Sequence, residues 1–223
     1  MGKIIESILK TKGIEYLASE DIKNIDTKYA SEAVCIDFTT PVAFKENYKF
    51  IAENFKAAVI GTTGWSDIKN DIFSYFLQQN KTLIYASNFS IGVNIFFKIN
   101  QLAASMLFEL GDYEPYIVEM HHNQKLDAPS GTAKTISELI EEIYKKNFII
   151  SSVRAGNIPG IHEVGYESEI DRILVKHEAF SRAGFAQGAV NAAIWSLELS
   201  GIYEFKDIIN KKLNKIIENS ITQ

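Results

Sequence analysis

The sequence has few of the residues that build disulfides and metal centres. It contains one cysteine, Cys35, so no disulfide can form within the chain. Cys35 lies in the apolar run AVCIDF, which indicates a buried, unreactive thiol rather than a nucleophile. Only four histidines are present, and their spacing does not match a zinc site, which needs three or four converging ligands. We therefore expect no metal, and we interpret His162 and His177, which lie in strand-like runs, as structural histidines.

Several longer sequence features are missing as well. No apolar run approaches the roughly 20 residues of a membrane span, and the start, MGKIIESILK, is too polar for a signal peptide. The formal net charge of −5 gives no general electrostatic reason to bind nucleic acid or an anionic membrane. Neither a Gly-x-Ser-x-Gly elbow nor a glycine-rich Walker loop occurs, which argues against acyl-transfer and nucleoside-triphosphate chemistry. These absences favour a cytoplasmic protein with no nucleic-acid partner and no membrane partner.

The composition is that of a folded protein, with 46% hydrophobic and 23% charged residues. In the first half, short β-branched or aromatic runs alternate with helical stretches, which is the pattern of a parallel sheet with crossover helices. We expect strands over residues 33–39, 57–63 and 82–87, and helices over residues 41–55 and 66–80. The predicted fold class is α/β, with a Rossmann-like doubly wound parallel sheet.

The second half has a different pattern. It begins with a helix over residues 93–111, which has apolar residues at helical spacing, namely Ile95, Ile99, Leu102, Met106 and Leu110. Strand-like runs then follow at 113–120, 148–156, 161–168 and 170–180, with one helix among them at 132–145. This indicates a second, mixed α+β domain, before a last amphipathic helix over residues 204–221. The expected domains are 1–90 together with 182–223, and 91–181.

The segment VEMHHNQKLDAPSGTAKTISELI, residues 118–140, places His121, His122 and Lys125 in a loop between a strand and a helix. Pro129 suits a helix start, and the Ser-Gly-Thr that follows leaves unpaired N–H groups at the helix N-terminus, which favours an anion there. Two imidazoles and an ammonium group add proton donors and positive charge near neutral pH. Either feature alone fits a solvated histidine pair or a plain helix cap. Together they favour a site for a small anion.

The block EMHHNQKLDAPSGTA resembles the family of 4-hydroxy-tetrahydrodipicolinate reductase, also called dihydrodipicolinate reductase. Further blocks agree in the same order: DFTTP at 37–41, GTTGW at 61–65, ASNFSIGVN at 86–94, RAGNIPGIHEVGYES at 154–168 and KHEAFSRAGFAQGAV at 176–190. The resemblance implies NADPH- or NADH-dependent reduction of 4-hydroxy-tetrahydrodipicolinate, a small cyclic dicarboxylate, to tetrahydrodipicolinate in diaminopimelate and lysine biosynthesis. It also implies a homotetramer that assembles through the second domain, which binds substrate, while the first domain binds the dinucleotide.

The resemblance implies a role for each residue of the loop. His121 is similar to the proton donor, His122 to a substrate-contacting histidine, and Lys125 to the second catalytic residue. Gly131 and Thr132 are similar to the pair that holds a substrate carboxylate. In the implied reaction a hydride reaches a ring carbon and the neighbouring position must be protonated, so an acid is needed where charge develops. The helix N-terminus can neutralise a carboxylate through its backbone donors.

Residues for the cofactor follow the predicted strands. Gly61, Thr62 and Thr63 lie where a strand ends, at the carboxyl edge of a parallel sheet, where doubly wound folds bind dinucleotides. On its own, Gly-Thr-Thr-Gly is a weak pattern that fits an ordinary βα turn. The resemblance implies that this block contacts the nicotinamide end, together with Ala86, Ser87, Asn88 and Phe89, and that Gly2 belongs to the phosphate loop.

The sequence departs from the family's pattern at its start. Members begin with a strand and a Gly-x-x-Gly-x-Met-Gly loop that wraps the pyrophosphate, whereas MGKIIESILKTKG resembles the end of that loop and its helix. We therefore expect a dinucleotide-binding domain that lacks its first strand, so that the strands around Val34 and Val59 each lose a ladder partner. An alternative is a non-catalytic, truncated remnant that keeps the assembly and dicarboxylate-binding domain. A third possibility, a dehydrogenase of the aspartate-semialdehyde type, would need a catalytic cysteine in a loop, and the position of Cys35 argues against it.

Overall fold

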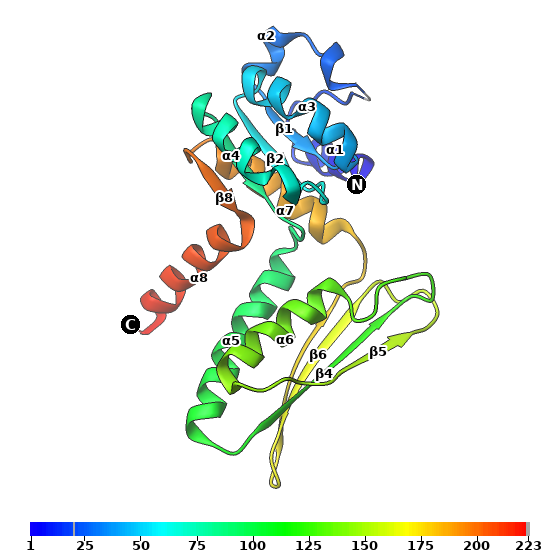
Figure 1. Ribbon diagram of the computed structural model, residues 1–223, viewed down its shortest axis with the longest axis vertical. Helices are drawn as coiled ribbons and strands as arrows, with labels where there is room; N and C mark the ends of the chain where they lie inside the picture. Colours follow the sequence, from blue (N-terminus) through cyan, green and yellow to red (C-terminus); the bar gives the residue numbers. More distant parts are fainter. Residues whose placement is uncertain (20, 222–223) are drawn as a thin grey trace. The chain divides into compact units, whose positions relative to one another are not determined.

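The computed structural model describes residues 1–19 and 21–221, and the chain divides into two compact units (Figure 1). The first unit comprises Met1–Ile91 and Ala183–Gln223, and the second comprises Gly92–Arg182. Each unit contains one four-stranded sheet; the first unit has a hydrophobic core on either face of its sheet, and the second unit has a core of its own.

The first unit contains a sheet whose strands all run parallel. They are β1 (Val34–Asp37), β2 (Ala57–Ile60), β3 (Thr82–Tyr85) and β8 (Ile202–Glu204), in the spatial order β1-β2-β3-β8. Successive residues of β2 point to opposite faces, so Ala58 and Ile60 pack in one core and Val59 packs in the other. A parallel sheet buried on both faces is the doubly wound arrangement, which confirms the predicted fold class.

Helices cover both faces of this sheet. One core is closed by α3 (Pro41–Asn54) and α4 (Lys69–Gln78), and the other by α1 (Gly2–Thr11), α7 (Ala183–Ser196) and α8 (Phe205–Ile221). Short helical turns are η1 (Ile22–Asn24), α2 (Thr27–Ala30) and η2 (Ser66–Ile68). Cys35 lies in the core under α3 and α4, where burial raises the pKa of its thiol well above the ordinary value. The prediction that Cys35 is a core residue is confirmed.

Several elements of this unit were not predicted, among them α7 and β8, and one expectation about it is wrong. The helix α7 is rich in alanine and glycine and carries no clear apolar stripe, and β8 has only three residues, so neither has a strong periodic pattern. The strand around Val59 does not lack a ladder partner, because β2 pairs with β1 on one side and with β3 on the other. The strand around Val34, β1, lies at the sheet edge, with β2 as its one hydrogen-bonded neighbour within residues 1–19 and 21–221.

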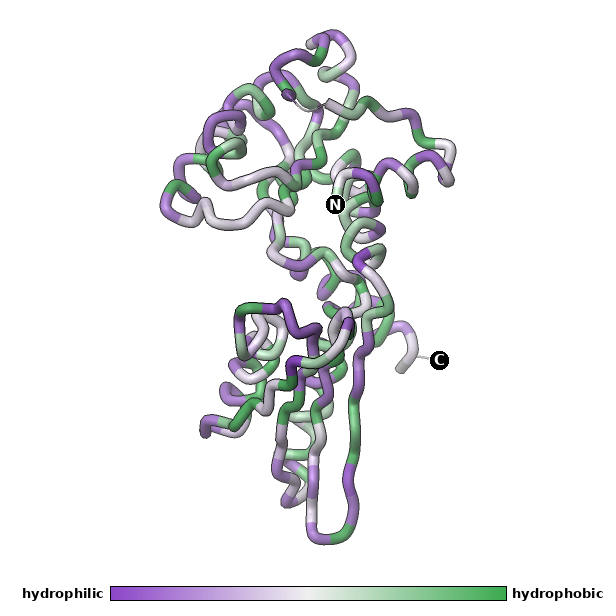
Figure 2. Tube along the Cα trace, turned by 90° about the vertical axis from the view of Figure 1, so that its right-hand side faces the viewer, coloured by the Kyte–Doolittle hydropathy of each residue, from purple (hydrophilic) through white to green (hydrophobic). Residues whose placement is uncertain are grey.

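The second unit combines a mixed sheet with two helices, as expected for α+β. Its strands are β4 (Glu114–His121), β5 (Ile150–Arg154), β6 (Ile161–Glu167) and β7 (Arg172–Glu178), in the spatial order β5-β4-β6-β7. β5 runs parallel to β4, whereas β6 and β7 pair antiparallel to their neighbours. Along β4, buried residues alternate with more exposed ones, and the tube in Figure 2 shows both hydrophilic and hydrophobic stretches in this unit. The helices α5 (Ile91–Leu110) and α6 (Gly131–Tyr144) pack against the apolar face of the sheet (Figure 1).

The helix α5 differs from the sequence-based expectation in two respects. By length and composition its 20 residues suffice to cross a membrane, so the expectation that no such stretch exists is wrong. Its buried face is formed by Phe96, Asn100 and Ala104 rather than by the predicted stripe. The Tyr166 hydroxyl of β6 donates to the Asn100 main-chain oxygen at 3.1 Å, which ties α5 to the sheet in the manner of a core helix. The predicted stripe is largely exposed, at Ile99, Leu102, Met106 and Leu110.

Candidate active site

The end of β4 carries two ionisable side chains into the interior of the second unit. Because side chains alternate between the two faces of a strand, Glu119 and His121 lie on the same face as the core residue Ile117. Glu119 is fully buried, and His121 is 8% exposed. A buried carboxylate is costly unless it is paired and hydrogen-bonded. The partners of Glu119 therefore decide what this site can do.

Glu119 has partners at both carboxylate oxygens. Its Oε1 accepts a hydrogen bond from the Arg154 guanidinium, from the end of β5, at 2.7 Å, and its Oε2 contacts Nδ1 of His121. Burial by itself raises the pKa of the Glu119 carboxyl, but hydrogen bonds from Arg154, Ser152 and His121 outweigh it and leave this pKa below its ordinary value. Glu119 is therefore a carboxylate at neutral pH.

His121 is held by this carboxylate. Burial lowers the pKa of the His121 imidazole, the hydrogen bond and charge of Glu119 oppose this effect, and the positive charges of Lys125 and Arg154 lower the pKa further. With Nδ1–H donated to Glu119, Nε2 is the ring atom that remains for another partner. A methyl group at Gly160 would lie 3.1 Å from Nε2, so the lack of a side chain at Gly160 leaves this atom accessible.

A second imidazole lies beside the first. His162, on β6, is the cross-strand neighbour of Glu119, and its ring centroid is 5.1 Å from that of His121. Burial, the charge of His121 and further cations lower the pKa of His162 to about 4, so it is neutral near pH 7. Its Nε2 lies 3.0 Å from Oγ of Ser130, which also accepts a hydrogen bond from the Ala133 N–H. Ser130 thus links the N-terminus of α6 to the sheet.

The convergence of Glu119, His121 and His162 was not apparent from sequence spacing. One potential ligand atom from each residue lies within 4.8 Å of the others, and zinc uses this set of donors. However, Glu119 is already bonded to the Arg154 guanidinium, whose positive charge opposes a cation at the same place. The arrangement therefore fits a proton-handling group better than a metal centre. The two-residue spacing of Glu119 and His121 in a strand was the available sequence signal.

The loop after β4 carries Lys125 and is fixed to the neighbouring strand. Lys125 Nζ donates to Oδ1 of Asp127 at 2.7 Å, and the Asp127 main-chain oxygen accepts a hydrogen bond from Arg154 at 2.6 Å. The His122 N–H donates to the Ile158 oxygen at 2.8 Å. Arg154 thus holds both the buried carboxylate and the Lys125 loop, a role that the sequence did not reveal.

The predicted anion cradle lies at the start of α6. Ser130 is the N-cap, and its side chain and main-chain oxygens accept the N–H groups of Ala133 and Lys134. In the part of the chain that the structure describes, the N–H groups of Gly131 and Thr132 have no acceptor. Space is open beside Gly131, where an added methyl group would contact nothing within 4 Å. The 14-residue helix therefore offers two backbone donors and its positive dipole end to an anion.

In the first unit, the residues predicted to bind the cofactor follow parallel strands and gather at one edge of the sheet. Buried Asp37, at the end of β1, contacts the Thr62 hydroxyl and accepts a hydrogen bond from the Thr39 N–H at 3.1 Å. The Gly61 N–H donates to the Asp37 main-chain oxygen at 2.8 Å. The Phe38 ring lies against Gly61 so closely that any side chain there would clash. Asp37, which the sequence did not single out, thus fixes the turn that contains Gly61 and Thr62.

A hollow of about 190 Å³ lies at this edge, and its lining includes Thr62, Thr63, Ala86 and Ser87. The other predicted cofactor residues are placed differently. The Phe89 side chain lies in the core and its carbonyl lies against Gly188, whereas the Asn88 side chain accepts the Ser90 N–H at 2.9 Å. Gly2 is the exposed first residue of α1. Thr62, Thr63, Ala86 and Ser87 are therefore the predicted residues that share one hollow.

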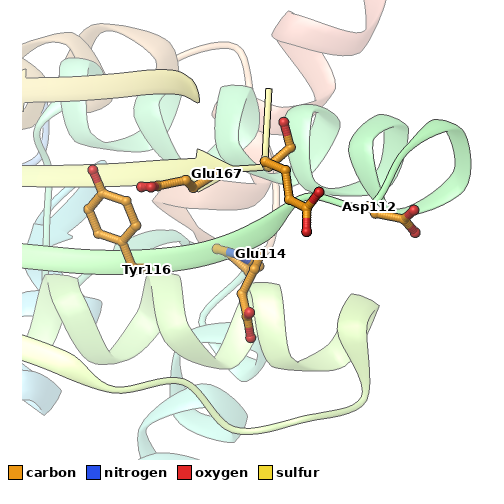
Figure 3. Close-up of a pocket in the computed structure, with 7 residues that line it drawn as sticks. Asp112, Glu114, Tyr116 and Glu167 are labelled. Carbon is orange, nitrogen blue, oxygen red and sulfur yellow. The ribbon is translucent and has the colours of Figure 1, made fainter. Parts of the chain in front are cut away.

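Another hollow, of about 450 Å³, lies at the opposite end of β4 from His121 (Figure 3). Four carboxylates line it, those of Asp112, Glu114, Glu167 and Glu169. Lys146 pairs with Glu114 at 2.5 Å, and Arg172 pairs with Glu167 at 2.7 Å. The remaining negative charge would repel an anionic substrate, so this hollow does not suit a dicarboxylate.

Comparison with known proteins gives one family for both units. The model described as "Dihydrodipicolinate reductase, N-terminus" matches residues 1–89, and that described as "Dihydrodipicolinate reductase, C-terminus" matches residues 92–209. A 4-hydroxy-tetrahydrodipicolinate reductase from Christiangramia forsetii is 40% identical over 224 residues, covering 94% of this chain and 94% of the relative. One from Methanoculleus marisnigri is 40% identical over 192 residues, covering 79% of this chain and 75% of the relative. The fold resembles dipicolinate-bound dihydrodipicolinate reductase from Paenisporosarcina sp. TG-14, with a TM-score of 0.72, 23% identity, and coverage of 89% of this chain and 83% of that one.

Proposed function

The chain belongs to the dihydrodipicolinate reductase family, and we propose that it reduces 4-hydroxy-tetrahydrodipicolinate to tetrahydrodipicolinate in diaminopimelate and lysine biosynthesis. The observation that carries this proposal is that both units match the family, and that relatives 40% identical to the chain are reductases of this name. The reductant is a pyridine nucleotide, either NADPH or NADH.

We assign nucleotide binding to the first domain, residues 1–90 with 182–223. The fit rests on the hollow at the carboxyl edge of the parallel sheet. Thr62 and Thr63 offer hydroxyl and backbone groups there, and Ala86 and Ser87 follow the carboxyl end of the neighbouring strand β3. Gly61 has no side chain to clash with Phe38, and the Thr62 hydroxyl donates a hydrogen bond to buried Asp37; both features hold this turn in one conformation. When bound, the nucleotide supplies the hydride. Further candidate contacts to the nucleotide are Gly61 and Asn88, together with the backbone groups of Phe89 and Gly2.

We assign proton delivery to His121. Its Nε2 is the ring atom that Glu119 leaves available, and the neighbouring Gly160 does not cover it. Lys125, whose Nζ donates to Asp127, can exchange this exposed partner for a substrate carboxylate or for developing negative charge. His121 and Lys125 thus act as proton donor and as a cation beside it.

We assign substrate binding to residues that present donors around this loop, in the second domain, 91–181. The N–H groups of Gly131 and Thr132 at the start of α6 would hold one carboxylate, and His122, which is half-buried, would contact the ring or the other carboxylate. Both donor sets suit a small cyclic dicarboxylate.

We also propose that the second domain assembles a homotetramer in the cytoplasm. Support comes from β7, which exposes Ile173 (42%) and Leu174 (50%) and pairs only with β6 within residues 1–19 and 21–221. Light scattering at micromolar concentration tests this assembly, and a monomer there would contradict it.

The reductase activity is tested by following the absorbance of NADPH or NADH with enzymatically generated substrate. We expect the chain to oxidise the nucleotide only when substrate is present, and His121→Gln to lower kcat by roughly 10²–10⁴-fold. A matched control is His177→Gln, which changes a histidine on β7 that the proposed chemistry does not use. Equal loss in both variants, or no substrate-dependent oxidation by the unmodified chain, would contradict the proposed function.

A further inference from the structure

We propose that Glu119 is a positioning residue for His121, which it holds through Nδ1 so that Nε2 exchanges the proton with substrate, and that Arg154 keeps Glu119 in its ionised form. This inference deepens the proposed function and rests on His121 as the proton donor. Neither Glu119 nor Arg154 is assigned a contact with substrate.

The geometry of β4 makes this pairing possible. Residues two apart in a strand share a face, so Glu119 and His121 stand side by side, and the contact of Oε2 falls on Nδ1 rather than on Nε2. A neutral imidazole carries one N–H, and an ionised carboxylate can only accept, so this contact places the proton on Nδ1. The carboxylate therefore selects both the tautomer and the ring orientation of His121.

The charges around His121 show why the carboxylate is needed. Arg154, from β5, and Lys125, from the loop, face His121 with positive charge. His162, from β6, faces it as a neutral ring. Burial adds a further penalty for the imidazolium. Of the groups around His121, Glu119 is the one that favours its protonated form. Removing Glu119 would therefore make the proton-donating form scarcer at neutral pH.

Arg154 completes the arrangement from the adjacent strand. His121 and Arg154 occupy partnered positions on β4 and β5, and Arg154 reaches Glu119 Oε1 at 2.7 Å. Without this cation, a fully buried carboxyl would favour its neutral form and would no longer attract a proton to His121. A purely structural ion pair would affect stability but would leave the ionisation of His121 unchanged, so the two explanations differ in a measurable way.

The test combines the pH dependence of kcat with an NMR titration of the histidine ring, which His121→Gln assigns. We expect Glu119→Gln to lower kcat roughly 10²-fold, to move the NMR midpoint of His121 to lower pH, and to change the ratio of its two neutral tautomers. The alkaline limb of kcat, where a proton donor loses its proton, should move in the same direction. Because Glu119→Gln leaves Arg154 without its carboxylate, the double variant Glu119→Gln/Arg154→Met removes both charges and should show the same downward shift. The matched control is Glu167→Gln, which breaks an exposed Arg–Glu pair at the far end of the same sheet.

The NMR titration needs no substrate, so it separates this inference from the proposed function. An unchanged midpoint and tautomer ratio for His121 in both Glu119 variants would overturn the positioning role, even if kcat falls. An unmodified chain that shows the expected dependence on Glu119 but no substrate-dependent oxidation of NADPH or NADH would instead overturn the reductase assignment. A shift of equal size in Glu167→Gln would show that the effect is not specific to Glu119, which also contradicts the inference.

Discussion

Replacing Arg154 by methionine should destabilise the second unit in a way that depends on pH. The side chain of Glu119 is 0% exposed and that of Arg154 is 18% exposed, so the pair is almost entirely buried. Removing one partner of a buried pair typically costs about 3–5 kcal/mol, because the other charge is left in a poorly solvating interior. Glu119 retains its contacts with His121 and Ser152. We therefore expect Arg154→Met to lower the free energy of unfolding near pH 7 by about 3 kcal/mol, the lower end of this range.

The sign of the pH dependence follows from the ionisation of Glu119. In the unmodified chain the pKa of its carboxyl is lowered in the folded state, so the carboxylate contributes stability above its unfolded pKa, and this is lost as pH falls through the folded pKa. In Arg154→Met the largest influence that remains is burial, which raises this pKa. A raised pKa reverses the sign of the pH dependence. The neutral carboxyl is then favoured at low pH, and the free energy of unfolding falls as pH rises through the folded pKa. The deficit of Arg154→Met should therefore be smaller near pH 5 than near pH 7.

Urea unfolding followed by circular dichroism, at one protein concentration and at both pH values, measures this difference. Arg172→Met is the matched control, because the Arg172–Glu167 pair has side chains that are 52% and 48% exposed and should contribute less than about 1 kcal/mol. A deficit for Arg154→Met of the same small size, or one that is equal at both pH values, would refute the reasoning that Arg154 keeps a buried carboxylate ionised.

Three further outcomes can be checked on the same preparation. Lys125→Met should lower kcat by roughly 10²–10⁴-fold with an unchanged circular dichroism spectrum, and an unchanged kcat would remove Lys125 from the site. Gly160→Ala would place a methyl group 3.1 Å from Nε2 of His121 and should lower kcat at least about tenfold by displacing the ring; kcat equal to that of the unmodified chain would show that Nε2 is not used. The NMR midpoint of His121 should rise when dipicolinate, a cyclic dicarboxylate, binds, because its negative charges favour the imidazolium. A midpoint that falls on binding would contradict this placement of the carboxylates.

Much of the fold could be predicted because its strands and helices have strong periodic patterns. The strands predicted at 33–39, 57–63 and 82–87 correspond to β1, β2 and β3, each a run of apolar residues bounded by turns. Elements without such a pattern, for example α7 and β8, were not predicted. The helix α5 was predicted, but its buried face was not. Apolar residues occur all round this helix, so packing against the sheet, rather than periodicity, selects Phe96 and Ala104 for the core.

The candidate site was predictable only where its residues are neighbours in the sequence. His121, His122 and Lys125 lie within one loop, and Gly131 begins the helix that follows, so a single segment revealed them. Arg154 and His162 come from other strands, and only the register of β4 with β5 and β6 brings them to Glu119. The sequence signal for Glu119 was its two-residue spacing from His121 in a predicted strand, and this spacing does not by itself indicate that the side chain points inward. Pairings between distant strands therefore carry the information that was missing.

The balance of charge around His121 explains how a histidine with a lowered pKa can donate a proton. Lys125, Arg154 and burial all disfavour its imidazolium, and Glu119 offsets them only in part. A dicarboxylate that arrives beside Lys125 and the start of α6 would bring two negative charges and remove the positive field that Lys125 exerts on the ring. Substrate binding would therefore raise the pKa of His121 at the moment when the acid is needed. In this proposal Lys125, which would attract the substrate, disfavours protonation of His121 until the substrate neutralises its charge, and Glu119 would fix which nitrogen receives the proton.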